Sequence, residues 1–199
     1  MSEKYKFDTM SLHSGHVPDK ETGSRAVPIY QTTSYVFKDT DEAAALYNME
    51  VGGHLYTRIS NPTIATLEQR LASLDGGVSC VACSSGMAAM HLVVTAIFSS
   101  GYHIVASNKM YGANINLLQH TMTRFGIETT FVNPNNIEEI EKAIKPNTKL
   151  VFGEVIGNPG LDVMNVPEVA KICKKKNVPL VIDATFNTCL LYTSDAADE

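Results

Sequence analysis

After residue 60 the hydrophobic residues follow two alternating patterns. Apolar runs predict strands, and apolar positions three or four residues apart predict helices. Strands are predicted at 78–83, 102–106, 129–132, 150–156 and 178–182. Helices are predicted at 62–75, 87–98, 113–125, 137–144 and 166–176. Because the strands are apolar throughout, the pattern indicates an α/β fold with a mainly parallel sheet and helices on both faces.

Two of these helices carry clear end signals. Asn61 followed by Pro62 is typical of an N-cap with proline at the first helical position, and Gly76 would end that helix. Asn165 precedes the last helix, and Glu168 three residues later forms a capping-box spacing.

Residues 1–60 are rich in turn formers and show no sustained periodicity, so we expect an extended arm. The arm also contains apolar and aromatic residues, namely Ile29, Tyr30, Tyr35, Val36, Phe37 and Tyr47. We therefore expect it to pack on another surface, that of a second subunit. The expected organisation is an arm at 1–60, a large domain at 61–188 and a separate tail at 189–199.

Composition and charge narrow the range of functions. The 199 residues are 44% hydrophobic and 19% charged, as in an ordinary soluble globular protein. A net charge of −5 argues against a nucleic-acid footprint, and the lysines at 174–176 are expected to complement a helix end. The chain has no apolar stretch near the roughly 18 residues of a membrane span, and residues 1–6 lack a signal peptide's apolar core. We expect a cytoplasmic location.

Cys80 and Cys83 form a C-x-x-C pair, which raises the question of a redox or zinc site. No second pair follows, and Cys173 and Cys189 lie alone. Alternation along the predicted strand would place Cys80 and Cys83 on opposite faces, which does not suit a shared metal. We predict buried structural thiols and no metal site.

Parallel sheets bind ligands beyond the carboxyl ends of their strands. Polar residues follow the apolar runs at 84–87, 108–111, 157–160 and 183–185. Ser85, Gly86 and Met87 at a helix start offer N–H groups and a positive dipole end, which suit a phosphate. An ordinary helix cap is the alternative.

Four further side chains suit a ligand that has a phosphate group or a planar ring. Arg58 and Tyr56 can add a forked charge and a hydroxyl to a phosphate, although a solvated arginine and a packing tyrosine remain open. Tyr111 can stack on a planar cofactor or belong to the core. Asp183 ends an apolar run, where a carboxylate is costly without a cationic partner. A protonated pyridine nitrogen would be such a partner, and a helix cap is the alternative.

Together these segments resemble a known family. The matching segments are Gly23 to Tyr35, Tyr56 to Thr63, Ser84 to Ala89 and Gly157 to Gly160. They resemble the Cys/Met-metabolism family of pyridoxal 5'-phosphate (PLP) enzymes, and within it the O-acetylhomoserine sulfhydrylases. The resemblance runs from about His13 to Thr188. It implies the large domain of an aspartate aminotransferase-like PLP-dependent transferase of fold type I, incomplete at its C-terminus.

The resemblance also implies roles for the residues that would bind the phosphate of PLP. Tyr56 and Arg58 match phosphate ligands that the family donates from a neighbouring subunit. Ser85, Gly86 and Met87 match the phosphate contacts at the helix start.

Residues around the cofactor ring are implied in the same way. Tyr111 matches a tyrosine that stacks on the ring and takes part in proton transfer. Asn158 matches the residue near the phenolic oxygen, Asp183 the pyridinium partner, and Thr185 a ring neighbour. Tyr111 and Asp183 are the implied catalytic residues.

The implied activity is replacement at the γ-carbon of O-acetylhomoserine by sulfide or a thiol, which gives homocysteine or methionine plus acetate. Methionine γ-lyase, cystathionine γ-synthase and cystathionine γ-lyase are the alternatives within the family. A phosphate ligand from a second chain implies a homodimer at least, and a homotetramer is expected. A non-catalytic fragment for cofactor binding or oligomerisation is the alternative of another class.

The sequence departs from the family pattern in three places. It reads Asp183-Ala184-Thr185 where the family has Asp-Asn-Thr, which leaves both contacting positions intact. It ends before the Ser-x-Thr-Lys segment whose lysine carries the cofactor, and Lys109 lies on the wrong loop for that role. Because this lysine is absent, we expect the fragment itself to be inactive. The tail at 189–199 does not resemble the family and is expected to be adapter-derived.

Overall fold

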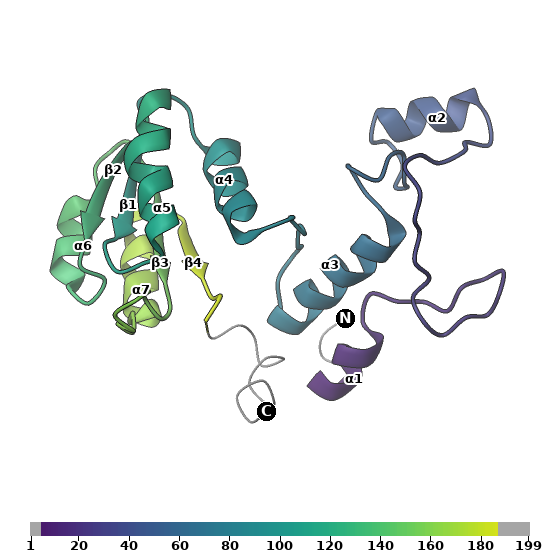
Figure 1. Cartoon of the computed structure of the whole chain (residues 1–199), viewed down its shortest axis with the longest axis horizontal. Helices are drawn as coiled ribbons and strands as arrows, with labels where there is room; N and C mark the ends of the chain where they lie inside the picture. The colour runs from purple at the N-terminus through teal and green to yellow at the C-terminus, as the bar shows by residue number, and fades with distance from the viewer. Residues whose placement is uncertain (1–4, 187–199) are drawn as a thin grey trace. The chain divides into compact units, whose positions relative to one another are not determined.

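The structure is a computed structural model, and it describes residues 5–186. The chain divides into two compact units, Met1–Ala82 and Cys83–Glu199 (Figure 1). The tail at 189–199, which we expect to be adapter-derived, lies outside the described residues.

The second unit is built on a four-stranded parallel sheet, as the sequence predicts. Its strands are β1 (His103–Ser107), β2 (Glu128–Val132), β3 (Thr148–Glu154) and β4 (Leu180–Asp183). Their order across the sheet is β2-β1-β3-β4, so the two most buried strands, β1 and β3, are neighbours. Four of the five predicted strands are thereby confirmed.

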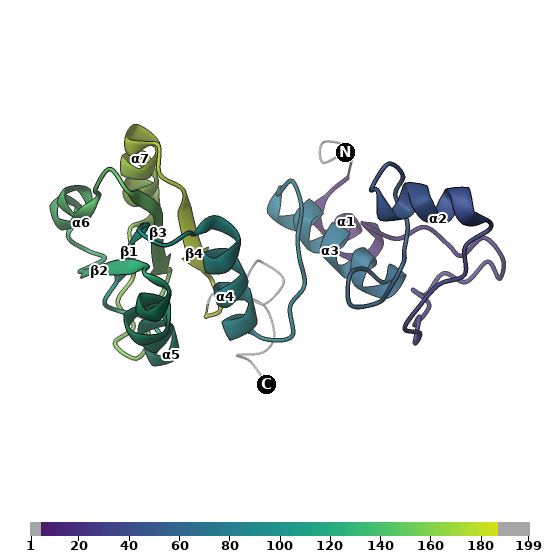
Figure 2. The same cartoon turned by 90° about the horizontal axis from the view of Figure 1, so that it is seen from above.

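Helices cover both faces of this sheet, which confirms the predicted layers (Figure 2). The helical elements of this unit are α4 (Gly86–Ile97), α5 (Gly112–Asn116), a π turn (Leu117–Thr121), a 3-10 turn (Met122–Phe125), α6 (Ile137–Ala143) and α7 (Val166–Lys176). One core cluster joins α4 and the turns after α5 to the sheet, and the other joins α6 and α7.

Alternation along the central strands explains why both faces are covered. Ile104 and Leu150 belong to the cluster under α4, whereas Val105 and Val151 belong to the cluster under α6 and α7. All four side chains are almost completely buried. A strand that is apolar at consecutive positions has no solvent face, so it requires a layer on each side.

Both predicted ends of α7 are confirmed. The Asn165 side chain accepts the Glu168 N–H at 3.3 Å at the start of the helix. At its end, Lys175 and Lys176 lie 3.1 and 3.4 Å from the Glu141 carboxylate of α6. The lysine cluster therefore joins two helices on one face of the sheet.

The predicted buried strand at 78–83 is wrong. This segment forms no strand, and Val78 and Val81 are 105% and 75% exposed. Within the described residues, the sheet consists of β1 to β4, and this segment is not one of its strands. Cys80 and Cys83 are consequently half-buried, whereas Cys173 is buried as predicted.

The first unit contains α1 (Phe7–His13), α2 (Thr40–Tyr47) and α3 (Pro62–Asp75). As predicted, α3 begins at the Asn61 cap and ends at Gly76, which has a left-handed conformation. α3 packs against α1, and Arg70 Nε donates to the Ser14 carbonyl at 2.9 Å. Gly15 has φ +75°, and a Cβ there would lie 2.6 Å from the Thr66 carbonyl oxygen, so the turn after α1 requires glycine.

The expectation that residues 1–60 lack secondary structure is wrong at α1 and α2. Asp39 accepts the Glu42 N–H at 2.8 Å, and the Glu42 carboxylate accepts the Lys38 N–H at 2.6 Å. This reciprocal cap holds the start of α2. The Asp-x-x-Glu spacing before three alanines was the signal that could have predicted it.

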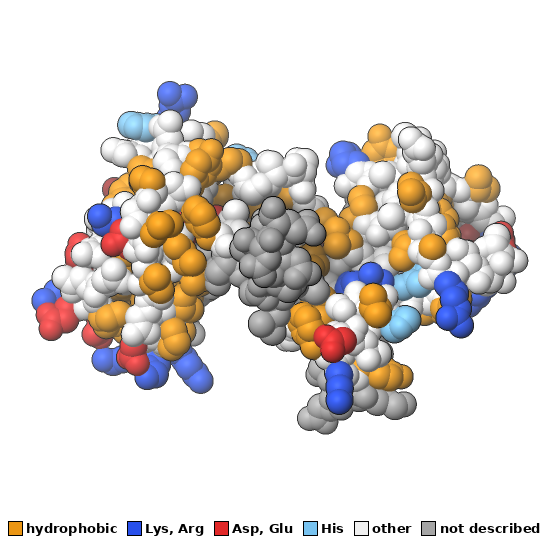
Figure 3. All heavy atoms as spheres, turned by 60° about the horizontal axis from the view of Figure 1, so that its bottom comes forward, with side chains coloured by type: hydrophobic (Ala, Val, Ile, Leu, Met, Phe, Trp, Pro, Cys, Tyr) orange, Lys and Arg blue, Asp and Glu red, His pale blue; other side chains and the backbone are white. Residues whose placement is uncertain are grey.

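Apolar side chains remain on the surface of both units (Figure 3). Every buried hydrophobic residue of the described chain belongs to the second unit, whereas Ile29 and Val36 of the first are 84% and 99% exposed. Across residues 5–186, no helix has both the length and the apolar sequence needed to cross a membrane.

His103 of β1 joins its own strand to the two neighbouring strands through its ring. Its Nδ1 lies 2.8 Å from Thr148 Oγ1 of β3, and its Nε2 lies 2.8 Å from Thr130 Oγ1 of β2. The side chain is completely buried. Burial, together with the charge of Lys145, holds the pKa of His103 below its ordinary value, although Glu128 acts in the opposite direction.

Replacement of His103 tests this link. We expect His103→Ala to lower the free energy of unfolding by about 2–4 kcal/mol, because two bonds are lost and a cavity forms. Since the folded-state pKa is lowered, the contribution of the neutral ring is complete above pH 6.5 and is lost as the pH falls through the folded-state value. Urea unfolding at several pH values measures both effects. The exposed His120→Ala is the control, and an equal pH dependence in both variants would contradict the assignment.

Asn61 joins the start of α3 to the preceding segments. Its Oδ1 accepts the Thr63 N–H at 2.9 Å, and its Nδ2 donates to the Tyr30 carbonyl at 2.8 Å. The side chain is 4% exposed. It therefore acts both as a helix cap and as a link to residues that precede it by about thirty positions.

We expect Asn61→Ala to cost about 2 kcal/mol, because a cap and a buried hydrogen bond are lost together. Asn136→Ala, which removes the simple cap of α6, should cost about 1 kcal/mol. Amide hydrogen exchange of Thr57, whose N–H donates to the Thr33 carbonyl at 2.8 Å, should accelerate only in Asn61→Ala. Unchanged exchange there would show that Asn61 acts only as a cap.

Candidate functional site

The strand order places a switch point at the carboxyl edge of the sheet, between β1 and β3. From β1 the chain passes through α5 on one face to β2, and from β3 it passes through α7 on the opposite face to β4 (Figure 2). Neighbouring parallel strands whose connections leave to opposite faces form the usual ligand site of such sheets. The site is therefore expected beyond the ends of β1 and β3.

Two loops meet at this point. The backbone N–H of Tyr111, after β1, donates to Glu154 Oε1 at the end of β3 over 2.7 Å. A Cβ at Gly157 would collide with the Lys109 carbonyl, so only glycine allows the two loops to approach so closely. Tyr111 and Asn158 thus lie on loops that contact each other, as the sequence predicts for residues at one sheet edge.

Glu154 is a candidate residue that the sequence analysis missed. It is 6% exposed and ends the apolar run of β3. Burial raises the pKa of its carboxyl group, and the charge of Asp183 adds to this, whereas N–H groups of Tyr111 and Asn158 and the Asn114 side chain lower it. An acid at a strand end was the signal that identified Asp183, and the same signal was present at Glu154.

Asp183 is the register partner of Glu154 on the neighbouring strand β4. Its Oδ1 accepts the Thr185 N–H at 2.9 Å and the Thr185 hydroxyl. Among residues 5–186, no donor is bonded to its other oxygen, Oδ2. Asp183 therefore orders the turn after β4, caps no helix within the described residues, and has one oxygen available to a ligand.

The Tyr111 ring is half-exposed, unlike a core tyrosine. Asn158 is half-buried and precedes a cis peptide bond to Pro159. The turn after it is held by the Gly157 N–H, which donates to the Asp162 carbonyl at 2.8 Å. The ring and the amide both belong to ordered loops at the carboxyl edge.

The start of α4 provides a possible anion site. The Ser85 hydroxyl accepts the Ala88 N–H at 3.1 Å, which confirms Ser85 as an ordinary cap. Within the described part of the chain, the N–H groups of Gly86 and Met87 have no acceptor. The position of a Cβ at Gly86 is open space. In Figure 1, α4 begins at the same lower edge toward which β4 points.

Tyr56 and Arg58 belong to the first unit. The Arg58 guanidinium carbon lies 5.6 Å from the centre of the Tyr56 ring, and both side chains are exposed. An antiparallel bridge between Ser34 and Tyr56 fixes the backbone of this segment. No ion pair to Arg58 occurs within residues 5–186, so its five donors are available to an anion.

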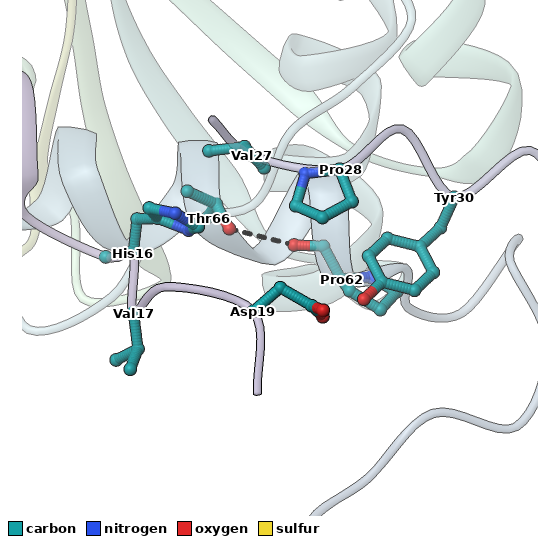
Figure 4. Close-up of a pocket in the computed structure, with 9 residues that line it drawn as sticks. His16, Val17, Asp19, Val27, Pro28, Tyr30, Pro62 and Thr66 are labelled. Carbon is teal, nitrogen blue, oxygen red and sulfur yellow. Dashed lines mark hydrogen bonds between the residues drawn. The ribbon is translucent and has the colours of Figure 1, made fainter. Parts of the chain in front are cut away.

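The first unit also has a hollow that contains none of the predicted site residues. It is lined by Gly15, His16, Val17, Asp19, Val27, Pro28, Tyr30, Pro62 and Thr66 (Figure 4). Hydrogen bonds from Thr22 lower the pKa of the Asp19 carboxyl at its rim. In the described residues, no group of three His, Cys, Asp or Glu side chains could hold a metal ion.

The second unit could hold a phosphorylated pyridine ring. The free N–H groups of Gly86 and Met87 suit a phosphate, the Tyr111 ring suits a planar partner, and Asp183 Oδ2 suits a protonated ring nitrogen. Thr185 would hold the other oxygen of Asp183 in place. The residues present are compatible with PLP, and their individual roles stay predictions.

Known proteins share both the sequence and the fold. The chain is 46% identical over 185 residues to the O-acetyl-L-homoserine sulfhydrylase of Leptospira meyeri, covering 93% of this chain and 42% of that protein. It is 35% identical to the L-methionine gamma-lyase of Fusobacterium nucleatum subsp. polymorphum, covering 94% of this chain and 47% of that protein. The chain thus spans less than half the length of these relatives.

Among solved structures, one described as an O-acetylhomoserine (thiol)-lyase from Campylobacter jejuni matches this chain with a TM-score of 0.87 and 37% sequence identity. That structure contains pyridoxyl-lysine 5'-monophosphate. The match covers 91% of this chain and 44% of that one. The metB structure from Corynebacterium glutamicum matches with a TM-score of 0.84 at 38% identity, with 92% of this chain and 46% of that one covered.

The fold is therefore that of the PLP-dependent transferases of fold type I, as predicted. A family model, Cys/Met metabolism PLP-dependent enzyme, matches residues 8–194. The chain belongs to the Cys/Met metabolism family of PLP-dependent enzymes.

Proposed function

We propose that the protein containing this chain uses PLP to replace the acetate of O-acetylhomoserine with sulfide or a thiol. Sulfide would give homocysteine and acetate, and methanethiol would give methionine and acetate. The observation that carries the proposal is the pairing of the Tyr111 loop with the strand end next to Asp183. The 46% identity to a sulfhydrylase supports the choice of substrate.

The chain's own residues would bind and orient the cofactor. Gly86 and Met87 would donate their N–H groups to the phosphate, with Ser85 capping the helix behind them. Tyr56 and Arg58 would come from a second copy of the chain, which makes a homodimer the minimum active unit and is compatible with a tetramer. Bound PLP supplies an electron sink for the carbon from which a proton is removed.

Residues at the sheet edge would control charge and protons. Asp183 Oδ2 would keep the pyridine nitrogen protonated, while Thr185 holds Oδ1. Asn158 would donate to the phenolic oxygen. The Tyr111 hydroxyl would accept and return a proton while its ring stacks on the cofactor, and acetate would leave from the γ-carbon before the thiol adds there.

The role of Asp183 can be tested with the chain itself. Pyridoxamine 5'-phosphate, which needs no lysine bond, serves as the probe, and its fluorescence measures binding. We expect Asp183→Asn to weaken binding about 10–100-fold, because a charge-assisted hydrogen bond is lost. Asp75→Asn, at the exposed end of α3, is the matched control. Equal affinity of Asp183→Asn and the unaltered chain would contradict the assignment.

The reaction is tested with the complete protein that contains this chain. We expect homocysteine and acetate from O-acetylhomoserine and sulfide, with kcat reduced about 10²–10⁴-fold in Tyr111→Phe and KM little changed. O-succinylhomoserine, cystathionine and methionine are the competing substrates. Release of methanethiol from methionine as the fastest reaction would favour the γ-lyase, an alternative supported by the 35% identity to that enzyme. Cofactor binding without turnover of any substrate would favour a non-catalytic role.

A further inference from the structure

We propose that Glu154 is a positioning residue, which holds the Tyr111 turn beside the carboxyl ends of β1 and β3. Through this link it would set the position of the Tyr111 ring relative to Asp183. The inference rests on the proposed function, because the position of the ring matters only if a planar cofactor binds there.

Glu154, at the end of β3, contacts the loop that carries Tyr111. Its Oε1 accepts the Tyr111 N–H at 2.7 Å. The Asn158 backbone and the Asn114 side chain also act on the carboxyl group, and both lower its pKa against the effect of burial. Glu154 is 6% exposed, so water cannot readily replace its bond to Tyr111.

Few side-chain contacts fix Tyr111. Its ring is 50% exposed, so packing does not determine where it lies. Tyr111 is the N-cap residue of α5, and no side chain caps this helix. Its carbonyl accepts the Asn114 N–H at 2.9 Å, which joins it to α5, whereas its N–H donates to Glu154. The Glu154 carboxylate therefore connects the turn to the central strand β3.

The register of the sheet allows Glu154 to position the Tyr111 turn relative to Asp183. Glu154 and Asp183 are paired residues on neighbouring parallel strands, so they lie side by side at the carboxyl edge. A backbone held by Glu154 is thereby held at a fixed place next to Asp183. Asp183 itself bonds to Thr185 on its own strand end and does not bond to the Tyr111 turn.

The first experiment measures the link in the unliganded chain. Glu154→Met keeps the volume but removes the acceptor, and Glu154→Gln keeps an acceptor oxygen. We expect amide hydrogen exchange of Tyr111 to accelerate about tenfold or more in Glu154→Met. In Glu154→Gln the Tyr111 N–H should stay protected, with an upfield shift of its NMR signal because an amide oxygen is a weaker acceptor. Glu128→Gln, at the amino end of β2, should change neither quantity.

The second experiment tests whether Glu154 acts through Tyr111. Binding of pyridoxamine 5'-phosphate is measured for Glu154→Met, Tyr111→Ala and the double variant. We expect Glu154→Met to weaken binding about tenfold alone and less than about twofold in the Tyr111→Ala background. Glu154→Gln should bind within about threefold of the unaltered chain.

Three results would overturn the proposal. They are unchanged Tyr111 exchange in Glu154→Met, an unmoved Tyr111 signal in Glu154→Gln, and equal weakening of binding with and without the Tyr111 ring. The second result applies even if Glu154→Met does not fold. If the unaltered chain fails to bind pyridoxamine 5'-phosphate, the proposed cofactor site is contradicted, while exchange and NMR still decide whether Glu154 holds the turn.

Discussion

The pairing of β1 with β3 constrains everything at the carboxyl edge of the sheet. Both strands are buried on both faces, so each requires a helical layer on either side. The helices that follow them leave toward opposite faces, and parallel sheets usually bind ligands beyond the strand ends at such a point. The Tyr111 and Asn158 loops begin there. The chemistry of the site is thus positioned by packing, since the loops are short and begin directly at the strand ends.

The sequence predicted those parts of the fold that depend on nearby residues. The cap at Asn61, the left-handed Gly76 and the amphipathic pattern of α7 are local signals, and all three were read correctly. The segment at 78–83 has the same apolar character as β3, yet it forms no strand. Whether an apolar run becomes a strand depends on a neighbour that pairs with it, and this is a property of the whole sheet.

For the candidate site too, the sequence predicted what depends on local patterns, which is the placement of its residues at one sheet edge. Asp183, Tyr111 and Asn158 follow apolar runs, and parallel topology alone brings such positions to one edge. That Glu154 bonds the Tyr111 backbone depends on the register of β3 and on the close approach that Gly157 allows. Neither can be read from spacing along the chain. Tyr56 and Arg58 lie in a unit whose described residues, from Tyr5 onward, include no buried hydrophobic side chain. Hydrogen bonds such as those of Asn61 help to hold this unit together.

Glu154 and Asp183 show how two neighbouring acids can have different tasks. Glu154 is the more deeply buried of the two acids, and its Oε1 accepts the Tyr111 N–H within the protein. Asp183 is half-buried and leaves one oxygen free at the edge. A cation arriving at this edge would meet Asp183 first and would relieve its repulsion with Glu154. The inner acid is therefore suited to hold the protein, and the outer one to hold a positively charged ligand.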